Sequence, residues 1–293
     1  MTQEDYEIFK LGDWELQTRE KITDAHIAYK TFGDPKSPAI VYPSWFSGSI
    51  ADNFWLIGED KTLNPKEFFI IIPALFGNGQ SSSPSNQPTP GVFPKVSFYD
   101  NVRAQYELVT KHFGITHLRA VIGWSMGGAQ TFQWATQYPD FIDLAIPFCG
   151  ASKTSLHNKV FLEGVKSALL AVKNTRSAGS GEIGTWQNGD VSMQEPYNGD
   201  FEKAMASIKA KTLVLPSKTD LYFPPEDSEY EVACMRPGVG KLDVFPSAWG
   251  HWAGGPGDNK EDVAWLDKQL STFFAENRAG GVTAMSEKLE GVL

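Results

Sequence analysis

Short, nearly continuous apolar runs, separated by helix-compatible stretches, limit what this chain can fold into. Runs of this kind are typical of strands buried on both faces of a parallel sheet. A loosely alternating segment at residues 6–30 precedes them and predicts two antiparallel strands. The alternation of strands and helices then predicts an α/β fold with a mostly parallel sheet. The runs are Ala39–Tyr42, Phe68–Ile72, Leu118–Ile122, Leu144–Phe148, Thr212–Leu215 and Leu242–Phe245, and the helical stretches are about 98–113, 127–137, 159–173, 200–207 and 259–275, the last capped by Asp258.

One long segment, Lys173–Gly199, interrupts this alternation. It is rich in glycine, serine and other turn formers, which predicts an irregular excursion between two strands. Its Gly179–Gly184 stretch matches the G-x-G-x-x-G pattern of dinucleotide sites. Neither a strand before it nor a long helix after it supports that function, so we interpret it as a flexible linker.

Composition excludes several classes of protein. The chain has 293 residues, 41% of them hydrophobic, which supports a packed core. Its formal net charge of −9 argues against binding to nucleic acid or to anionic membranes. We expect Cys149 and Cys234 to be buried free thiols, and no histidine or cysteine spacing is typical of a metal site. Without a signal segment or a membrane span, the sequence predicts a cytoplasmic protein.

The strongest chemical motif is Gly123-x-Ser125-x-Gly127, which follows a predicted strand and precedes a predicted helix. This is the context of a nucleophile elbow, in which a strained turn exposes the serine hydroxyl above the sheet. The glycines let strand and helix approach closely. The Met126 N–H would then be one oxyanion donor. The alternative is an ordinary glycine-rich turn that contains a serine.

Histidine positions favour one general base for Ser125. In this type of fold the triad runs along the chain as serine, acid, histidine. Only His157 and His251 follow Ser125, and His251 lies on a glycine-rich loop after the last predicted strand. A base in that position can hang over the nucleophile. His157, just after the strand that follows the elbow, is the less favoured alternative.

The acid is expected after the preceding strand, where Asp220 lies. Its role would be to fix the His251 tautomer and to stabilise the imidazolium. Glu226 and Asp227 compete, but they follow two prolines and are explained as carboxylates in the first turn of a helix.

The second oxyanion donor should come from the loop after the first parallel strand, Pro43–Gly48. The Phe46 N–H is the preferred candidate, with Trp45 as an alternative and the Ser47 hydroxyl as an addition. Tryptophans near these loops indicate an apolar acyl pocket, although ordinary packing explains each of them equally well. They are Trp45, Trp124, Trp249 and Trp252, with Phe46 and Phe223 as possible additions.

These residues resemble those of a known family, the homoserine O-acetyltransferase-like branch of the α/β-hydrolase superfamily and its acetyltransferase-like members. The resemblance extends over residues 6–275 and implies an α/β-hydrolase fold, with a mostly parallel sheet flanked by helices. By the family pattern, Ser125, Asp220 and His251 are nucleophile, acid and base, in agreement with the spacing argument. The matching stretches are Tyr42–Gly48, Ala51–Gly58, Pro73–Pro84, Tyr99–Gln105, Gly123–Gly128, Pro147–Ala151, Thr219–Asp227 and Gly250–His251.

The family also implies a helical lid between the strands near Phe148 and Thr212. Here the helix Lys159–Val172 leads quickly into linker sequence, so we expect a reduced lid. The chain also has no good match to the arginine-bearing lid segment that would hold a homoserine carboxylate. Relatives often dimerise through the lid, which leaves a homodimer open. The expected single domain, 1–293, divides into a core at about 6–150 and 210–275, a lid at about 151–209 and a tail at 276–293.

Acyl transfer through an acyl-enzyme is common to all the enzymatic functions we favour. A reduced lid admits water, so the sequence favours a hydrolase of a carboxylic ester or related acyl compound. The main alternative is an O-acyltransferase, for which acetyl-CoA would be a co-substrate; no other cofactor is expected. A non-catalytic binder on a hydrolase scaffold is the second alternative, and lyase or carbon–carbon hydrolase chemistry on the same triad also stays open.

Overall fold

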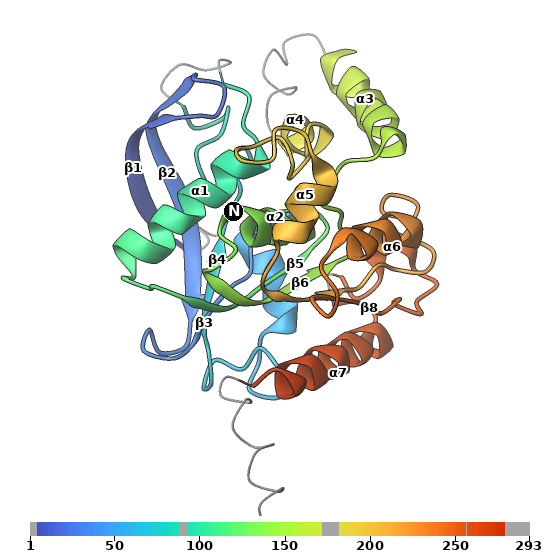
Figure 1. Cartoon of the computed structure of the whole chain (residues 1–293). Coiled ribbons are helices and arrows are strands. Elements are labelled where there is room, and N and C mark those ends of the chain that lie inside the picture. Colours follow the sequence, from blue (N-terminus) through green and yellow to red (C-terminus); the bar gives the residue numbers. More distant parts are fainter. Residues whose placement is uncertain (1–4, 88–92, 172–181, 256, 279–293) are drawn as a thin grey trace, which may run out of the picture.

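An eight-stranded sheet forms the centre of the computed structural model, which describes residues 5–87, 93–171, 182–255 and 257–278 (Figure 1). The strand order is β1-β2-β4-β3-β5-β6-β7-β8. β1 and β2 form the predicted antiparallel pair, β2 pairs antiparallel with β4, and all other pairs are parallel. The predicted fold class is therefore confirmed. The strands are β1 (Glu7–Glu15), β2 (Lys21–Phe32), β3 (Ala39–Val41), β4 (Phe69–Pro73), β5 (Leu118–Trp124), β6 (Ile142–Phe148), β7 (Lys211–Val214) and β8 (Gly240–Leu242).

The last strand differs from the sequence prediction. β8 ends at Leu242, where the predicted run begins. Beyond it, the backbone N–H of Phe245 still donates to Pro216 O at 2.8 Å. Pro216 itself has no backbone N–H, so it cannot donate a hydrogen bond to the neighbouring strand. The regular ladder therefore stops, and only the isolated bridge between Ser217 and Phe245 continues the pairing.

Helices cover both faces of the sheet, with α1 and α7 on opposite sides in Figure 1. The predicted helices appear with small shifts, and the first of them ends in a π-helical turn, Leu108–His112. The helices are α1 (Phe98–Glu107), α2 (Met126–Gln137), α3 (Leu156–Ala171), α4 (Glu182–Gln187), α5 (Phe201–Ser207), α6 (Pro225–Cys234) and α7 (Lys260–Glu276), with 3-10 turns at Ile50–Leu56 and Gly250–Trp252.

Two details of the helix prediction are wrong. The segment predicted to be irregular contains α4, whose Ile183, Thr185 and Trp186 are buried; a short helix that owes its stability to tertiary burial leaves little periodicity in the sequence. The cap of α7 is Asn259 rather than Asp258, because the Asn259 side chain accepts the backbone N–H groups of the first turn. Residues 173–181 of that segment, with the first half of the G-x-G-x-x-G match, and the tail beyond residue 278 lie outside the described residues.

Alternate residues of the central strands point into two apolar layers, one on each face of the sheet. Ile71 and Val121 face the layer under α1 and α2, whereas Ile70 and Ile122 face the layer under α7. Because apolar side chains cover both faces of these strands, the strands read as unbroken apolar runs. Cys149 is buried as expected, but Cys234 is only half-buried. Within the described residues, no helix is both long and apolar enough to span a bilayer.

A buried carboxyl group ties α6 to the chain after β6. Glu231 Oε1 accepts hydrogen bonds from the backbone N–H and the hydroxyl of Ser152, and burial raises the pKa of this carboxyl to about 8. An unfolded glutamate ionises near 4.5. Between these two values the folded state binds more protons than the unfolded state, so this group makes the protein less stable as pH rises through that window.

We therefore expect Glu231→Gln to weaken the loss of stability between pH 5 and pH 8.5, because the amide cannot ionise and its oxygen can still accept from Ser152. The measurement is the melting temperature of wild type and variant across this range. Glu229→Gln, an exposed glutamate on the same helix, is the control and should follow the wild type. Parallel curves for wild type and Glu231→Gln would contradict the prediction.

Candidate functional site

Ser125 lies in the turn between β5 and α2, in the backbone conformation that a nucleophile elbow requires. Its φ and ψ are 56° and −122°, a region that costs an L-residue free energy. Two hydrogen bonds hold the turn: Ser125 N–H donates to Phe148 O at 3.0 Å, and Ala129 N–H donates to Ser125 O at 3.1 Å. Met126 follows as the first residue of α2, so the serine stands between a strand end and a helix N-terminus.

The glycines around Ser125 allow a close approach that no larger residue permits. A Cβ on Gly123 would lie 2.1 Å from Gly127 O, and one on Gly150 would lie 2.5 Å from Ser125 O. A Cβ on Gly127 would lie 2.9 Å from Pro43 O. These contacts are with backbone atoms, which cannot rotate away. Gly123 thus serves the strand–helix packing predicted from the sequence, whereas Gly127 lets α2 approach the loop after β3.

We expect Gly123→Ala to destabilise the protein by about 3 kcal/mol, the upper end of typical overpacking costs, because the new methyl group overlaps a backbone carbonyl. Thermal unfolding measures the effect. Gly164→Ala on α3 is the matched control: nothing lies within 4 Å of its added Cβ, and alanine favours a helix by up to about 1 kcal/mol. Equal melting temperatures for the two variants would contradict the packing argument.

Three of the predicted site residues meet in a continuous hydrogen-bonded chain. His251 Nε2 lies 2.9 Å from Ser125 Oγ, and His251 Nδ1 lies 2.8 Å from Asp220 Oδ2. The other oxygen, Asp220 Oδ1, accepts the backbone N–H groups of Tyr222 at 2.7 Å and Phe223 at 3.1 Å. Asp220 and Ser125 are each 2% exposed, so solvent does not compete for these bonds.

A second set of hydrogen bonds fixes the loop that carries His251. Gly250 N–H donates to Thr219 Oγ1 at 3.0 Å, next to the acid, and Gly250 has a φ of +59°. Ser247 Oγ donates to the buried Asp262 Oδ2 at 2.6 Å and accepts the Trp249 N–H. The loop is thereby anchored both to the segment after β7 and to α7. Such support keeps the imidazole in line with its partners.

The other histidines lie elsewhere and have partners or exposure that explain them. His26 contacts Gln80 O and Ser82, His112 hydrogen-bonds to Tyr29, and His117 pairs with Asp143. His157 is exposed on α3. None of them shares a hydrogen bond with Ser125 among the described residues.

The carboxylates that compete with Asp220 for the role of the acid lie outside the hydrogen-bonded chain. Glu226 and Asp227 lie in the first turn of α6, as the sequence predicts. Cys149 is buried beside the site, where its thiol donates to Ala253 O at 3.8 Å. Burial, and then the nearby Asp220 charge, raise the pKa of this thiol well above its usual value, so it stays protonated.

The loop after β3 lies against the start of α2, beside Ser125. Gln130 on α2 donates to Ser44 O at 2.9 Å, and Asn53 donates to Tyr42 O and Pro43 O. Within the described part of the chain, no protein acceptor takes the backbone N–H of Phe46 or of Met126. These two donors, predicted from the sequence, are therefore free for a ligand.

The four tryptophans predicted to line a pocket differ in burial and in their contacts. Trp124 stacks on the His251 ring with centroids 5.0 Å apart, and it contacts Trp45 and Trp252. Trp45 and Trp124 are buried, whereas Trp249 and Trp252 are 64% and 52% exposed and line a separate surface cavity of about 660 Å³. Trp124 thus supports the imidazole from behind.

Of an apolar cluster on the other side of His251, sequence reasoning named only Phe46 and Phe223 as possible pocket residues and missed the other rings. Met126 belongs to it, and Tyr222 and Phe223 contact the His251 ring at 5.0 and 5.4 Å. From α4, Trp186 stacks on Phe223 and meets Phe46 edge-on at 5.4 Å. The only sequence signal for Trp186 was an aromatic residue inside a turn-rich segment. Through Tyr222 and Phe223, this cluster packs apolar rings against His251 on the α4 side of the site.

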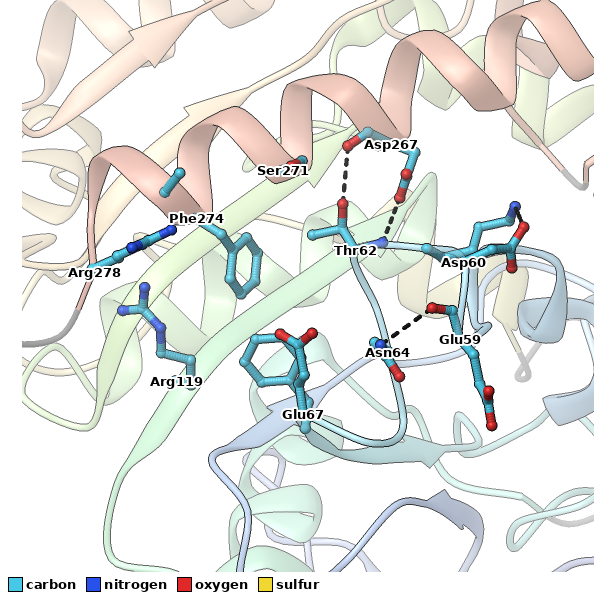
Figure 2. A pocket seen from close by; sticks show the side chains of 13 residues that line it. Glu59, Asp60, Thr62, Asn64, Glu67, Arg119, Asp267, Ser271, Phe274 and Arg278 are labelled. Carbon is cyan, nitrogen blue, oxygen red and sulfur yellow. Dashed lines mark hydrogen bonds and ion pairs between the residues drawn. The ribbon is translucent and has the colours of Figure 1, made fainter.

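Another cavity, of about 720 Å³, lies far from this site (Figure 2). Arg119 at the start of β5 lines it together with Phe274 of α7 and Arg278 just beyond that helix, and Thr62 is hydrogen-bonded to Asp267 beside them. Ser125 follows the other end of β5, about 20 Å away at the usual rise per strand residue. The cavity contains none of the predicted site residues.

Comparison with known proteins agrees with this geometry. Residues 46–163 match the family model of the alpha/beta hydrolase fold. The chain is 30% identical to a probable esterase of Corynebacterium glutamicum, covering 92% of this chain and 95% of that protein. It is 30% identical to an ethyl acetate hydrolase of Pseudomonas veronii, covering 76% and 82%. A homoserine O-acetyltransferase of Methanohalobium evestigatum is 33% identical over 55% of this chain and 37% of that protein.

A solved structure extends the similarity to the whole fold. The acetylester hydrolase from Corynebacterium glutamicum superposes with a TM-score of 0.83 at 30% identity, covering 92% of this chain and 96% of that chain. Identity of this level over nearly the full length of both proteins reaches well beyond the motif around Ser125. The chain is an enzyme that belongs to the α/β-hydrolase superfamily, in the branch that contains homoserine O-acetyltransferases and related esterases.

Proposed function

We propose that this enzyme hydrolyses a carboxylic ester of a small acyl group through an acyl-enzyme on Ser125. The observation that carries the proposal is the hydrogen-bonded chain from Ser125 Oγ through His251 to Asp220. The similarity to a probable esterase and to an ethyl acetate hydrolase supports a small ester as substrate. Because the chain belongs to a family of enzymes, a purely non-catalytic binder has no support from these relatives.

In the first step His251 Nε2 takes the hydroxyl proton as Ser125 Oγ attacks the acyl carbonyl carbon. The carbonyl oxygen becomes an oxyanion, which the free N–H groups of Met126 and Phe46 can receive. His251 then gives its proton to the departing alkoxide, leaving the acyl group on Ser125. Throughout, Asp220 stays ionised, accepts the hydrogen bond of the His251 Nδ1–H and stabilises the imidazolium.

In the second step water repeats the sequence: His251 takes a proton from water, hydroxide adds to the acyl carbon, and Ser125 leaves as its proton returns. The apolar cluster that includes Phe46, Trp186 and Phe223 would hold the acyl chain. Because two rings of this cluster contact His251, the partner of the nucleophile, we expect a short acyl chain.

The alternative is transfer of the acyl group to an alcohol, with acetyl-CoA as the acyl donor. It rests on the 33% identity to a homoserine O-acetyltransferase. An acceptor alcohol would take the place of water in the second step, which requires that water be kept out.

Product analysis separates the two functions. We expect p-nitrophenyl acetate, incubated with the enzyme and a millimolar acceptor alcohol such as homoserine, to give free acetate as the main product. The second arm uses acetyl-CoA in place of the ester, and we expect little release of CoA. Acetylated acceptor in excess over free acetate, in either arm, would overturn hydrolysis in favour of transfer.

A further inference from the structure

The loop that carries the proposed oxyanion donor makes a tight turn. Gly48 N–H donates to Trp45 O at 3.0 Å, and Ser47 has a φ of +59°. A residue with a side chain rarely adopts this conformation, so neighbouring contacts must hold it. Trp45 is held by its edge-on contact with Trp124. The question is what holds Phe46 and Ser47.

One short helix contacts both residues. Glu182, the first residue of α4, accepts the backbone N–H of Ser47 at its Oε2, with an N···O distance of 2.8 Å. One turn further along the same helix, Trp186 meets the Phe46 ring edge-on at 5.4 Å. The helix lies more than 130 residues away in the chain, so only the tertiary fold brings these groups together.

Glu182 as a whole is half-buried, but one of its two carboxyl oxygens is enclosed. Its Oε1 reaches no solvent and has no hydrogen-bond partner among the described residues. Burial raises the pKa of the group to about 7, and the Ser47 N–H opposes part of that rise. A buried carboxyl group with one unpaired oxygen is unfavourable. A glutamate at a helix start could instead face water, so its inward orientation indicates that the contact with Ser47 has a function.

We propose that Glu182 is a positioning residue for the oxyanion hole: by holding the Ser47 N–H it fixes the adjoining peptide unit and so aims the Phe46 N–H at the oxyanion. The inference rests on the proposed function, because an oxyanion forms only when Ser125 attacks an acyl carbon. The substrate carbonyl makes weaker hydrogen bonds than the oxyanion does. Loss of Glu182 should therefore lower kcat and leave KM nearly unchanged.

The experiment compares Glu182→Leu and Glu182→Gln with wild type on p-nitrophenyl acetate. Removing one oxyanion donor outright typically costs about 10²–10³ in kcat. We expect Glu182→Leu, which only misaligns the donor, to lower kcat by about 10- to 100-fold with KM within about twofold. Glu182→Gln keeps an oxygen that can accept the Ser47 N–H, so it should retain most of the activity.

A second readout follows the oxyanion site directly. Phenylboronic acid forms a bond from Ser125 Oγ to boron while His251 takes the hydroxyl proton, and a boron-bound oxygen then occupies the oxyanion position. We expect its inhibition constant to rise in Glu182→Leu by about the factor by which kcat/KM falls. The matched control is Glu163→Leu. Glu163 is an exposed carboxylate of α3 that contacts Gln187 of α4 and lies outside the loop after β3, so its loss should leave both readouts unchanged.

Three results would overturn the inference: an unchanged kcat in Glu182→Leu, an equal loss in Glu182→Gln and Glu182→Leu, or an equal loss in Glu163→Leu. Melting temperatures show whether each variant is folded, and the folded Glu182→Gln keeps the test decisive if Glu182→Leu is unstable. Ser125→Ala separates the two proposals. If Ser125→Ala hydrolyses the ester as wild type does, the proposed function fails, whereas an inactive Ser125→Ala with a fully active Glu182→Leu refutes only the role of Glu182.

Discussion

Ser125→Ala is expected to lower kcat for ester hydrolysis by on the order of 10⁴- to 10⁶-fold, the largest effect of any substitution considered for this enzyme. In the proposed mechanism no acyl-enzyme can form without Oγ, and His251 at 2.9 Å from that atom has no hydroxyl to deprotonate. Removing the hydroxyl leaves the strained turn in place, because its backbone bonds to Phe148 and Ala129 do not involve the side chain. The melting temperature should therefore change little.

The measurement combines steady-state kinetics with labelling by a fluorophosphonate probe, followed by mass spectrometry of the labelled peptide. Wild type should carry one label on Ser125, and Ser125→Ala should carry none. Ser271→Ala is the control, since this exposed serine lies on α7 beside the distant cavity. A label that persists in Ser125→Ala would show that another group is the nucleophile.

Asp220→Asn should have the second-largest effect, a loss of about 10⁴-fold in kcat at neutral pH. The oxygen of the new amide can keep the backbone hydrogen bonds from Tyr222 and Phe223 that Asp220 Oδ1 accepts. The NH₂ group of the amide then faces His251 Nδ1, which must become an acceptor. The ring proton moves to Nε2, so this nitrogen can no longer accept the Ser125 proton.

The control for Asp220→Asn is Asp227→Asn, which removes a nearby carboxylate in the first turn of α6. We expect Asp227→Asn to keep kcat within about twofold of wild type. Kinetics at neutral pH, with melting temperatures for both variants, provide the comparison. If Asp227→Asn were the inactive variant and Asp220→Asn the active one, the identity of the acid would be wrong.

Much of the fold could be predicted because the local sequence of many elements indicates their type. A strand buried on both faces must be apolar along its whole length, so β4 and β5 were visible as runs. The elbow was visible too, since Gly123 and Gly127 are required by backbone contacts of 2.1 and 2.9 Å that no Cβ allows. Chain order then pointed from Ser125 to Asp220 and His251, which the structure brings within hydrogen-bond distance.

The elements that the sequence did not predict are those whose stability comes from distant contacts. α4 is a helix of six residues, too short to persist without the burial of Ile183 and Trp186. The end of β8 also depends on a distant segment, because its regular pairing stops where the neighbouring Pro216 lacks a backbone N–H. Propensity and periodicity describe only local preferences, and here tertiary packing overrides them.

The sheet, the elbow and the three residues that meet at it could be inferred from the sequence alone, because strand burial, turn strain and triad order each leave a local pattern. The contacts around these three residues depend instead on how the folded layers pack. In the folded protein Trp124 stacks on His251, and Trp186 contacts Phe46. The Glu182 carboxyl group accepts the Ser47 N–H. Those contacts join segments far apart in the chain, and their geometry depends on how whole layers pack, which no local pattern records.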